Sequence, residues 1–319
     1  MSAQATLRIG TRGSALALWQ ARHVEALIGA QPGAPPVELV RIRTEGDART
    51  DVPLWQIGGR AFFTKEIDRA LLAGEVDIAV HSLKDLSTVL EPGIQLAATL
   101  AREDPRDALV SRSGAPLAHL PRGARVGTSS LRRRAFLART RPDAALLELR
   151  GNVPTRIERL EHGEYDAIIL AAAGLRRLGL ERHISELLSA ELFPPAVSQG
   201  AIGVCVRAGD AGTAQWLQPL DDAASRLATT AERALLRTVE GGCQVPLGAL
   251  GTLGGNVLQL HAAVCALDGS TMLRAQGEMP ATLANATSLG RRLGEDLLSQ
   301  GAARLIAHER DSRRTVEEP

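Results

Sequence analysis

Leu7-Arg-Ile-Gly-Thr-Arg-Gly-Ser14, close to the beginning of the chain, sets the pattern on which the fold is built. Its first three residues are a short strand candidate, and the glycine-rich turn leads into a helix that we expect over residues 15–28, with Ser14 as its N-cap. A similar order recurs where Arg125-Val126 enters Gly127-Thr-Ser-Ser-Leu-Arg-Arg-Arg134. Because strands that alternate with helices are typical of parallel sheets, we expect an α/β fold.

The length and composition of the chain limit the classes of function. A length of 319 residues suggests two or three domains at about 100–200 residues each. Lys and Arg number 37 against 36 Asp and Glu, and aromatic residues make up 3%, so neither a basic field nor base stacking indicates a nucleic-acid partner. The start lacks the apolar core of a signal peptide, and no run approaches the ~18 apolar residues that a membrane span needs. We expect a cytoplasmic protein with no membrane or metal partner.

The stretch Glu240-Gly-Gly-Cys-Gln-Val-Pro246 follows a helix that we expect over residues 222–239. Glycine favours the left-handed conformation of a C-terminal cap, so Cys243 should lie on a short loop. A helix C-terminus disfavours a thiolate, which favours a covalent attachment point over a turnover nucleophile. A surface thiol tolerated by chance is the alternative. The two other cysteines, Cys205 and Cys265, lie in apolar runs, where a thiol packs as a small hydrophobe.

A second candidate site follows the mostly apolar strand Val76-Asp-Ile-Ala-Val-His81, where Ser82-Leu-Lys-Asp85 begins. In open α/β sheets, ligands bind beyond the carboxyl ends of the strands. Asp85 is therefore a candidate catalytic acid, and Lys84 would favour its ionised form. A surface ion pair worth about 0–1 kcal/mol is the alternative. We interpret His81 as a satisfied structural histidine.

Arginines recur at predicted strand ends and helix starts. They are Arg12, Arg132, Arg133, Arg150, Arg156 and Arg177. Guanidinium groups match carboxylate or phosphate in a bidentate manner, and a charge-assisted hydrogen bond contributes about 1.5–3 kcal/mol. The free N–H groups of a helix start add to such a site. The pattern favours a ligand with many carboxylates, and solvated helix faces are the alternative.

The periodic pattern lapses over residues 44–60, which contain glycines, a proline and interspersed charges. Structureless segments longer than about 12–15 residues in compact domains are usually functional lids or disordered, and we interpret this one as a lid. A helix should follow near Lys65 to Leu72. Later in the chain we expect a crossing strand over 197–206, strands near 257–265 and 272–276, and a helix near 284–299.

Six motifs together resemble the porphobilinogen deaminase (hydroxymethylbilane synthase) family, in the family's order and from about Leu7 to Ala307. They are Gly-Thr-Arg-Gly-Ser at 10–14, His81-Ser-Leu-Lys-Asp85, Arg102-Glu-Asp-Pro-Arg-Asp107, Gly127-Thr-Ser-Ser-Leu-Arg-Arg133, Leu149-Arg-Gly-Asn-Val-Pro-Thr-Arg156 and Glu240-Gly-Gly-Cys-Gln-Val-Pro246. Each motif is weak alone, but six in sequence are highly specific. These transferases join four porphobilinogen units head to tail and release ammonia each time. Water then frees the linear tetrapyrrole hydroxymethylbilane.

The resemblance implies roles for particular residues. Cys243 would carry a dipyrromethane cofactor through a thioether, and Asp85 would be the catalytic carboxylate that assists loss of the amine. Phe63 would pack beside the substrate ring. The residues that would hold acetate and propionate side chains are Lys84, Arg12, Ser14, Thr128, Ser129, Arg132, Arg133, Arg150, Arg156, Arg177 and Gln199. The substrate would be porphobilinogen, and the protein would act as a monomer.

The resemblance also implies three α/β domains. Two lobes would resemble periplasmic binding proteins of type II, over residues 1–101 plus 198–219 and over 102–197. A smaller α+β domain over 220–319 would present the cysteine loop. Six positions depart from the family's usual residues, namely Gln56, Ala61, Ser87 with Thr88, Pro154 and Ser198.

Other classes of protein explain less of the sequence. A periplasmic binding module would share the two lobes but would need neither Cys243 nor Asp85, and it normally carries a signal peptide. A thiol hydrolase would need a histidine partner, which the sequence leaves open. A nucleic-acid binder would use the arginines but would have a basic balance.

Overall fold

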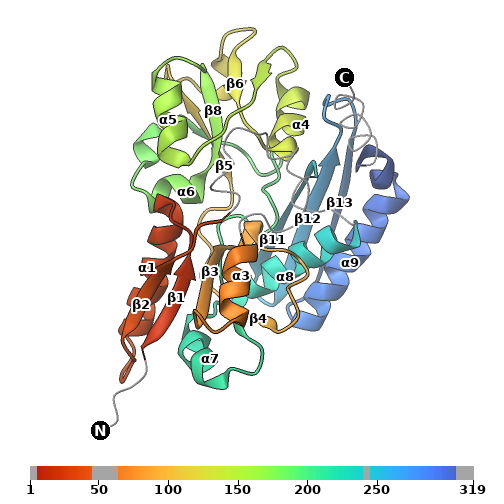
Figure 1. Cartoon of the computed structure of the whole chain (residues 1–319). Helices are drawn as coiled ribbons and strands as arrows, with labels where there is room; N and C mark the ends of the chain where they lie inside the picture. The colour runs from red at the N-terminus through yellow and green to blue at the C-terminus, as the bar shows by residue number, and fades with distance from the viewer. Residues whose placement is uncertain (1–5, 45–63, 240–244, 307–319) are drawn as a thin grey trace, which may run out of the picture.

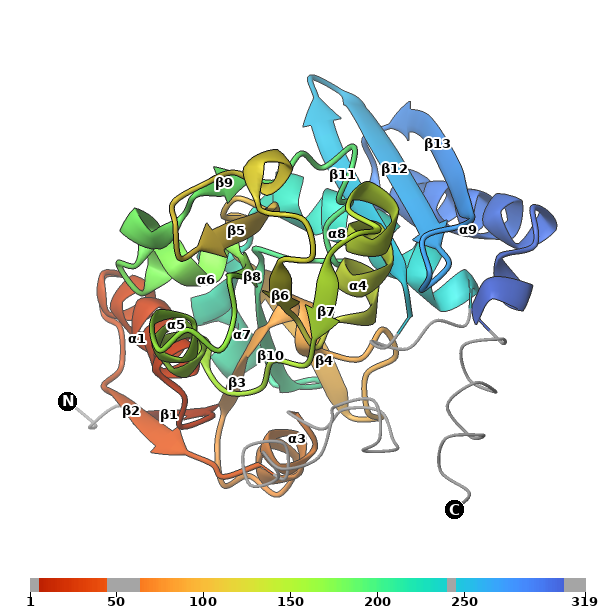
Figure 2. The ribbon, with the colours of Figure 1, turned by 90° about the horizontal axis from the view of Figure 1, so that it is seen from above.

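The computed structural model describes residues 6–44, 64–239 and 245–306, and three separate β-sheets are present in that part of the chain. Figure 1 shows two of the sheets one above the other and the third beside them. Figure 2, from above, shows the third unit to one side of the two stacked units. We call these three units the first lobe, the second lobe and the C-terminal unit.

The first lobe is a five-stranded sheet in the order β2-β1-β3-β10-β4. Strands β1, β2 and β3 are parallel, whereas β10 is antiparallel to both of its neighbours. Helices α1 and α3 cover opposite faces, because alternate residues of β3 join the apolar cluster under α1 or the one under α3. The elements are β1 (Leu7–Thr11), α1 (Ala15–Gly29), β2 (Val37–Arg41), α3 (Lys65–Leu72), β3 (Ile78–Ser82), β4 (Ile94–Thr99), β10 (Ile202–Arg207) and α7 (Ala211–Leu217).

The second lobe repeats this plan in the order β7-β6-β8-β5-β9. Strands β6, β7 and β8 are parallel, and β5 is antiparallel to β8 and β9. The elements are β5 (Asp107–Ser111), β6 (Arg125–Gly127), α4 (Leu131–Thr140), β7 (Ala145–Leu147), α5 (Val153–Glu161), β8 (Ala167–Ala171), α6 (Ala172–Arg177) and β9 (Glu186–Leu187). In each lobe, the antiparallel strand is the one that the chain forms directly after it crosses from the other lobe.

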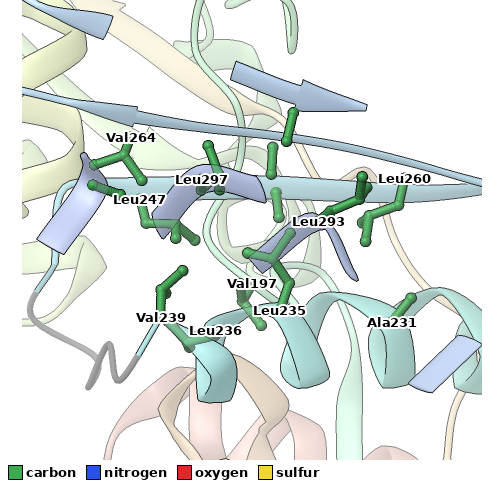
Figure 3. Close-up of a cluster of buried hydrophobic side chains, with 14 of the residues drawn as sticks. Val197, Ala231, Leu235, Leu236, Val239, Leu247, Leu260, Val264, Leu293 and Leu297 are labelled. Atoms are coloured by element: carbon green, nitrogen blue, oxygen red, sulfur yellow. The ribbon is translucent and has the colours of Figure 1, made fainter. Parts of the chain in front are cut away.

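The C-terminal unit packs two helices on an antiparallel sheet in the order β11-β12-β13. Figure 3 shows its core, where Leu235 and Leu236 of the first helix lie near Leu293 and Leu297 of the second. Gly290 allows the two helices to approach closely because it has no side chain. A Cβ at this position would collide with the Ala231 carbonyl oxygen. The elements are α8 (Ala223–Thr238), β11 (Leu247–Gly254), β12 (Val257–Cys265), β13 (Met272–Pro280) and α9 (Leu283–Ser299).

A buried carboxylate fastens the crossing segments to the C-terminal unit. Glu232 of α8 is fully buried and accepts hydrogen bonds from Arg102 Nη1 at 2.5 Å, from the Ser198 N–H at 2.6 Å and from the Gly251 N–H at 2.8 Å. Arg102 and Ser198 belong to the outgoing and returning connections between the lobes. One side chain therefore fixes both connections, which keeps the two lobes in a defined relation.

The expected elements are largely confirmed. The α/β class is confirmed, and helix α3 and strand β12 begin and end where the sequence predicts them. Strand β11 was missed, because a glycine at every third residue of Leu247-Gly-Ala-Leu-Gly-Thr-Leu-Gly254 hides the two-residue apolar periodicity of a strand. The crossing strand begins at Ile202, five residues later than expected. The exact domain boundaries stay predictions.

None of the helices within the described residues is long and apolar enough to cross a membrane. The predicted lid, Gln56, Ala61, Phe63 and Cys243 lie outside the described residues.

Candidate functional site

The carboxyl ends of β1 and β3 bring together the candidate residues of the first lobe. Arg12 follows β1, and Leu83–Asp85 forms a 3-10 turn directly after β3. These strands are parallel, so both segments lie at the same edge of the sheet. Ser14 caps α1, because its Oγ accepts a hydrogen bond from the Ala17 N–H at 3.3 Å. The expected N-cap is thus confirmed, and the binding role of Ser14 stays a prediction.

Lys84 is held at the boundary between the lobes. Its Nζ donates to Gln199 Oε1 at 3.3 Å. Loss of hydration lowers the pKa of Lys84 to about 8, and the Asp85 carboxylate partly opposes this shift. The Lys84 charge is therefore sensitive to pH within the physiological range.

Arg132 and Arg133, in the first turn of α4, are buried and paired with one carboxylate. Arg132 Nη1 lies 2.7 Å from Asp107 Oδ2, and Arg133 Nη2 lies 2.8 Å from Asp107 Oδ1. Asp107 is fully buried, and the two guanidinium groups hold its pKa well below the usual range. The alternative that these two arginines lie on solvated helix faces is excluded, since Arg132 is 3% exposed and Arg133 is 6% exposed. Arg132 Nε is buried and makes no hydrogen bond among the described residues, so it keeps an unused donor.

Gln199 connects the two groups of cations. Its Nε2 donates to Asp107 Oδ1 at 2.9 Å and to the Pro105 carbonyl at 2.8 Å, while its Oε1 accepts from Lys84. The amide therefore faces the carboxylate with its donor side and the ammonium with its acceptor side. This single side chain on the returning connection couples the Lys84 ammonium of the first lobe to the arginine pair of the second.

Arg156 and Arg177 are two partly buried arginines of the second lobe. Arg156 Nε donates to the Gly151 carbonyl at 2.7 Å, and Arg177 Nη2 donates to the Gly200 carbonyl at 2.6 Å. Burial lowers the pKa of each to about 10, and neighbouring arginines contribute to the shift at Arg156. Both groups remain cationic at neutral pH.

Four of these cations line one cavity of about 90 Å³ between the lobes. Lys84 comes from the first lobe, and Arg133, Arg156 and Arg177 come from the second. None of the described lining residues is an aspartate or glutamate, so the cavity concentrates positive charge. The Ser82 hydroxyl at the end of β3 adds a polar group. Such a surface attracts an anion with several carboxylates.

The remaining predicted binding residues have structural contacts of their own. Ser129 Oγ donates to the Leu149 carbonyl, and Thr128 Oγ1 accepts from the Ser130 N–H at 3.2 Å. Arg150 is partly buried and follows Leu149 in the turn before α5. These residues lie at the carboxyl ends of β6 and β7, as the sequence predicts, and their ligand contacts stay predictions.

The interpretation of His81 was wrong in one respect. The side chain is buried, as expected, but its Nε2 has no hydrogen-bond partner within the described part of the chain, and Asp68 Oδ1 lies 3.9 Å away. Burial lowers the pKa of His81 to about 4 and raises that of Asp68 to about 6, so this histidine is neutral. Cys205 and Cys265 are buried, as predicted.

Sequence reasoning missed two residues that organise the site, Asp107 and Glu232. In the sequence, Asp107 was noted only as the last residue of the motif Arg102-Glu-Asp-Pro-Arg-Asp107, and Glu232 only as part of a helix. A carboxylate at the first position of an apolar strand is a weak signal for a buried counter-ion. The partner arginines are 25 and 26 residues away, so only the fold reveals the pairing.

The fold and the cavity define a two-lobed α/β protein with a cavity lined by cationic side chains between its lobes. A family model described as the dipyromethane cofactor binding domain of porphobilinogen deaminase matches residues 7–215. A second, described as the C-terminal domain of porphobilinogen deaminase, matches residues 226–299.

Curated relatives agree with the two family models. The porphobilinogen deaminase of Roseiflexus castenholzii is 51% identical over 303 residues, which are 95% of this chain and 99% of the relative. That of Syntrophotalea carbinolica is 47% identical over 301 residues, or 94% and 95%. A YaeC-family lipoprotein structure from Enterococcus faecalis, at 12% identity and a TM-score of 0.41, covers 67% of this chain and 90% of its own and is too distant to carry an argument. The chain belongs to the porphobilinogen deaminase family.

Proposed function

We propose that this protein is a hydroxymethylbilane synthase, which condenses four porphobilinogen units head to tail with release of ammonia and then releases the linear tetrapyrrole by hydrolysis. Family membership supports the reaction. The observation that carries the proposal is the cavity where Lys84, Arg133, Arg156 and Arg177 converge from two lobes and which no described aspartate or glutamate lines. A substrate with an acetate and a propionate needs such a cationic surface, and polymerisation adds carboxylates with every unit.

The donors present fit a dipyrromethane cofactor with carboxylate side chains. The unused, buried Arg132 Nε is a donor that a ligand carboxylate would satisfy. Arg133, Arg156 and Lys84 line the interlobe cavity and would hold further carboxylates. When bound, the cofactor supplies the pyrrole to which the first unit is joined. We propose Cys243 as its attachment point.

Within this function, the residues of the first lobe act on the reacting unit. Asp85 lies on the 3-10 turn beyond β3, where its carboxylate would assist loss of the amine and stabilise positive charge on the pyrrole nitrogen. Lys84, beside it, would bind a substrate carboxylate while cationic. The arginines of the second lobe would neutralise the remaining carboxylates, so no metal is needed for this task.

We further propose that the protein acts as a cytoplasmic monomer, with domains over 1–101 plus 198–219, 102–197 and 220–319. Support comes from a cavity that two lobes of a single chain assemble, and from the buried thiols of Cys205 and Cys265, which suit a reducing compartment. The strands of each sheet come from the corresponding range.

Intact-mass measurement tests the attachment. The purified wild-type protein should carry a dipyrrole adduct, and Cys243→Ser should carry none. Cys205→Ser, which changes a buried thiol, is the matched control and should keep the adduct. An unmodified wild-type chain that consumes porphobilinogen normally would contradict the proposal.

Replacement of the catalytic carboxylate tests the chemistry. Asp85→Asn should lower turnover of porphobilinogen by about 10²–10⁴-fold, the usual contribution of a positioned acid or base. The circular dichroism spectrum and thermal midpoint should be unchanged. The exposed Glu91→Gln, in the same lobe, removes a carboxylate without affecting turnover. Near-normal rates in Asp85→Asn would remove Asp85 from this role.

A further inference from the structure

A second and larger cavity lies next to the interlobe cavity. It measures about 520 Å³ and is lined by Ala15, Trp19, Arg22, His23, Arg177 and Leu178. The first four belong to α1 of the first lobe, and the last two lie at the end of α6 of the second lobe. Arg177 lines both cavities, so the two lie on either side of one guanidinium side chain.

The lining of the larger cavity combines a flat aromatic surface with positive charge. The rings of Trp19 and His23 stack with centroids 5.1 Å apart and an interplanar angle of 21°. The Arg177 guanidinium lies 5.7 Å from the Trp19 ring centroid, on the side of the second lobe. Arg22 is exposed, and the described residues give it no ion pair. Planar heteroaromatic rings stack on such a surface, and carboxylates pair with the two guanidinium groups.

The sizes of the two cavities support separate roles. Ligand pockets usually measure about 300–1,000 Å³, so the interlobe cavity of about 90 Å³ is too small for several pyrrole rings. The cavity of about 520 Å³ has room for a pyrrole with its two carboxylate side chains. A reaction that joins four units therefore needs space of this kind beside the reacting position.

We propose that the cavity formed by Trp19, Arg22, His23 and Arg177 is an outer subsite for a carboxylate-bearing pyrrole ring. This inference rests on the proposed function. The ring would stack on Trp19, and its carboxylates would pair with Arg22 and Arg177. The occupant is either an incoming porphobilinogen or a ring of the lengthening product, because both present the same chemistry.

The rates of successive additions test the proposal and distinguish the two occupants. Intact-mass analysis of quenched samples gives the rate of each of the four additions for wild type, Arg22→Gln and Trp19→Leu. Arg291→Gln, an exposed arginine of α9, is the control and should match wild type. For Arg22→Gln we expect about a threefold effect, since an exposed ion pair is partly screened.

The pattern of slowing identifies the occupant. If an incoming unit occupies the subsite, all four additions slow at low porphobilinogen and recover at saturation. If a product ring occupies it, the first addition is unchanged and the third and fourth slow even at saturation. Equal rates at every step in Arg22→Gln and wild type would overturn the inference and leave the proposed function standing. A wild-type chain that adds no unit would overturn both.

A direct measurement of occupancy does not depend on rates. The His23 imidazole proton resonance, assigned through its loss in His23→Gln, should shift when the wild-type holoprotein is loaded with porphobilinogen. Because a nearby carboxylate favours the imidazolium, the pKa of His23, which burial and Arg177 lower in the free protein, should rise. A His23 resonance and pKa that loading leaves unchanged would overturn the inference.

Discussion

The two lobes share one strand plan but divide the chemistry between them. Each has three parallel strands followed by an antiparallel strand that the chain supplies after a crossing. In the first lobe, a 3-10 turn after the third parallel strand places the half-buried Lys84 and Asp85 at the sheet edge. In the second lobe, the helix after β6 buries Arg132 and Arg133 against Asp107.

This difference shows how one architecture can serve opposite purposes. A side chain that reacts needs access to the substrate, and the 3-10 turn beyond β3 provides it. A side chain that holds charge in a fixed direction needs a rigid setting, and a buried counter-ion provides it. Asp107 offsets part of the desolvation cost of two buried guanidinium groups, which would otherwise be prohibitive. The second lobe is therefore preorganised for anions before any ligand arrives.

Removal of the Asp107 carboxylate should have the largest effect on the difference between the lobes, through the free energy of unfolding. Asp107→Asn leaves two arginines buried without their carboxylate, and loss of one partner of a buried ion pair costs about 3–5 kcal/mol. Urea denaturation at pH 7 should show a loss of that size. The control Asp143→Asn, which removes the partner of the more exposed Arg141, should have a much smaller effect.

The pH dependence of this loss has a defined sign. The pKa of Asp107 is lower in the folded protein than in the unfolded chain, so its stabilisation is present above about pH 4 and declines as the pH falls. The difference in stability between wild type and Asp107→Asn should therefore narrow below pH 4. A constant difference down to pH 2 would contradict the assignment of the ionised pair.

The pH dependence of kcat/KM should show that the charge of Lys84 in the first lobe, unlike that of the arginines in the second, changes near neutral pH. The pKa of Lys84 is lowered to about 8, so its cationic form is lost as the pH rises above 8. The value of kcat/KM for porphobilinogen should then fall, by about tenfold over one pH unit well above that pKa. In Lys84→Arg, which stays cationic, this alkaline limb should be absent even if the rate at pH 7 is lower. A limb retained in Lys84→Arg would assign it to another group.

The smallest expected effect is at the connection between the lobes. Ser198 is the one non-glycine residue with a positive φ among the described residues, at 63°, and its buried Oγ has no partner. This conformation costs about 1–2 kcal/mol for an L-residue. Ser198→Gly should therefore stabilise the protein by about 1 kcal/mol in urea denaturation, after allowance for the backbone entropy of glycine.

A control variant separates the two causes at this position. Ser198→Ala removes the unpaired hydroxyl and keeps the backbone strain, so it should recover less stability than glycine does. If Ser198→Gly destabilises the protein, the assignment of backbone strain to this residue is wrong.

Sequence reasoning succeeded where local pattern and side-chain chemistry agree. The α1 cap at Ser14 and the α3 boundaries follow from capping and apolar periodicity. It failed at β11, where glycines interrupt the periodicity, and at His81, whose missing partner depends on the neighbours that α3 supplies. Asp107 was missed because its two arginines are distant along the chain.

The sequence by itself determined the family, the alternation of strands and helices, and the placement of charged residues after strands, because these follow from motif order, periodicity and residue type. Only the tertiary structure decided which of those charges face a cavity and which face each other. That distinction depends on desolvation and on distances between residues far apart in the chain. It is the antiparallel return of β10 and the burial of Asp107 that place Lys84 and the arginines around one space.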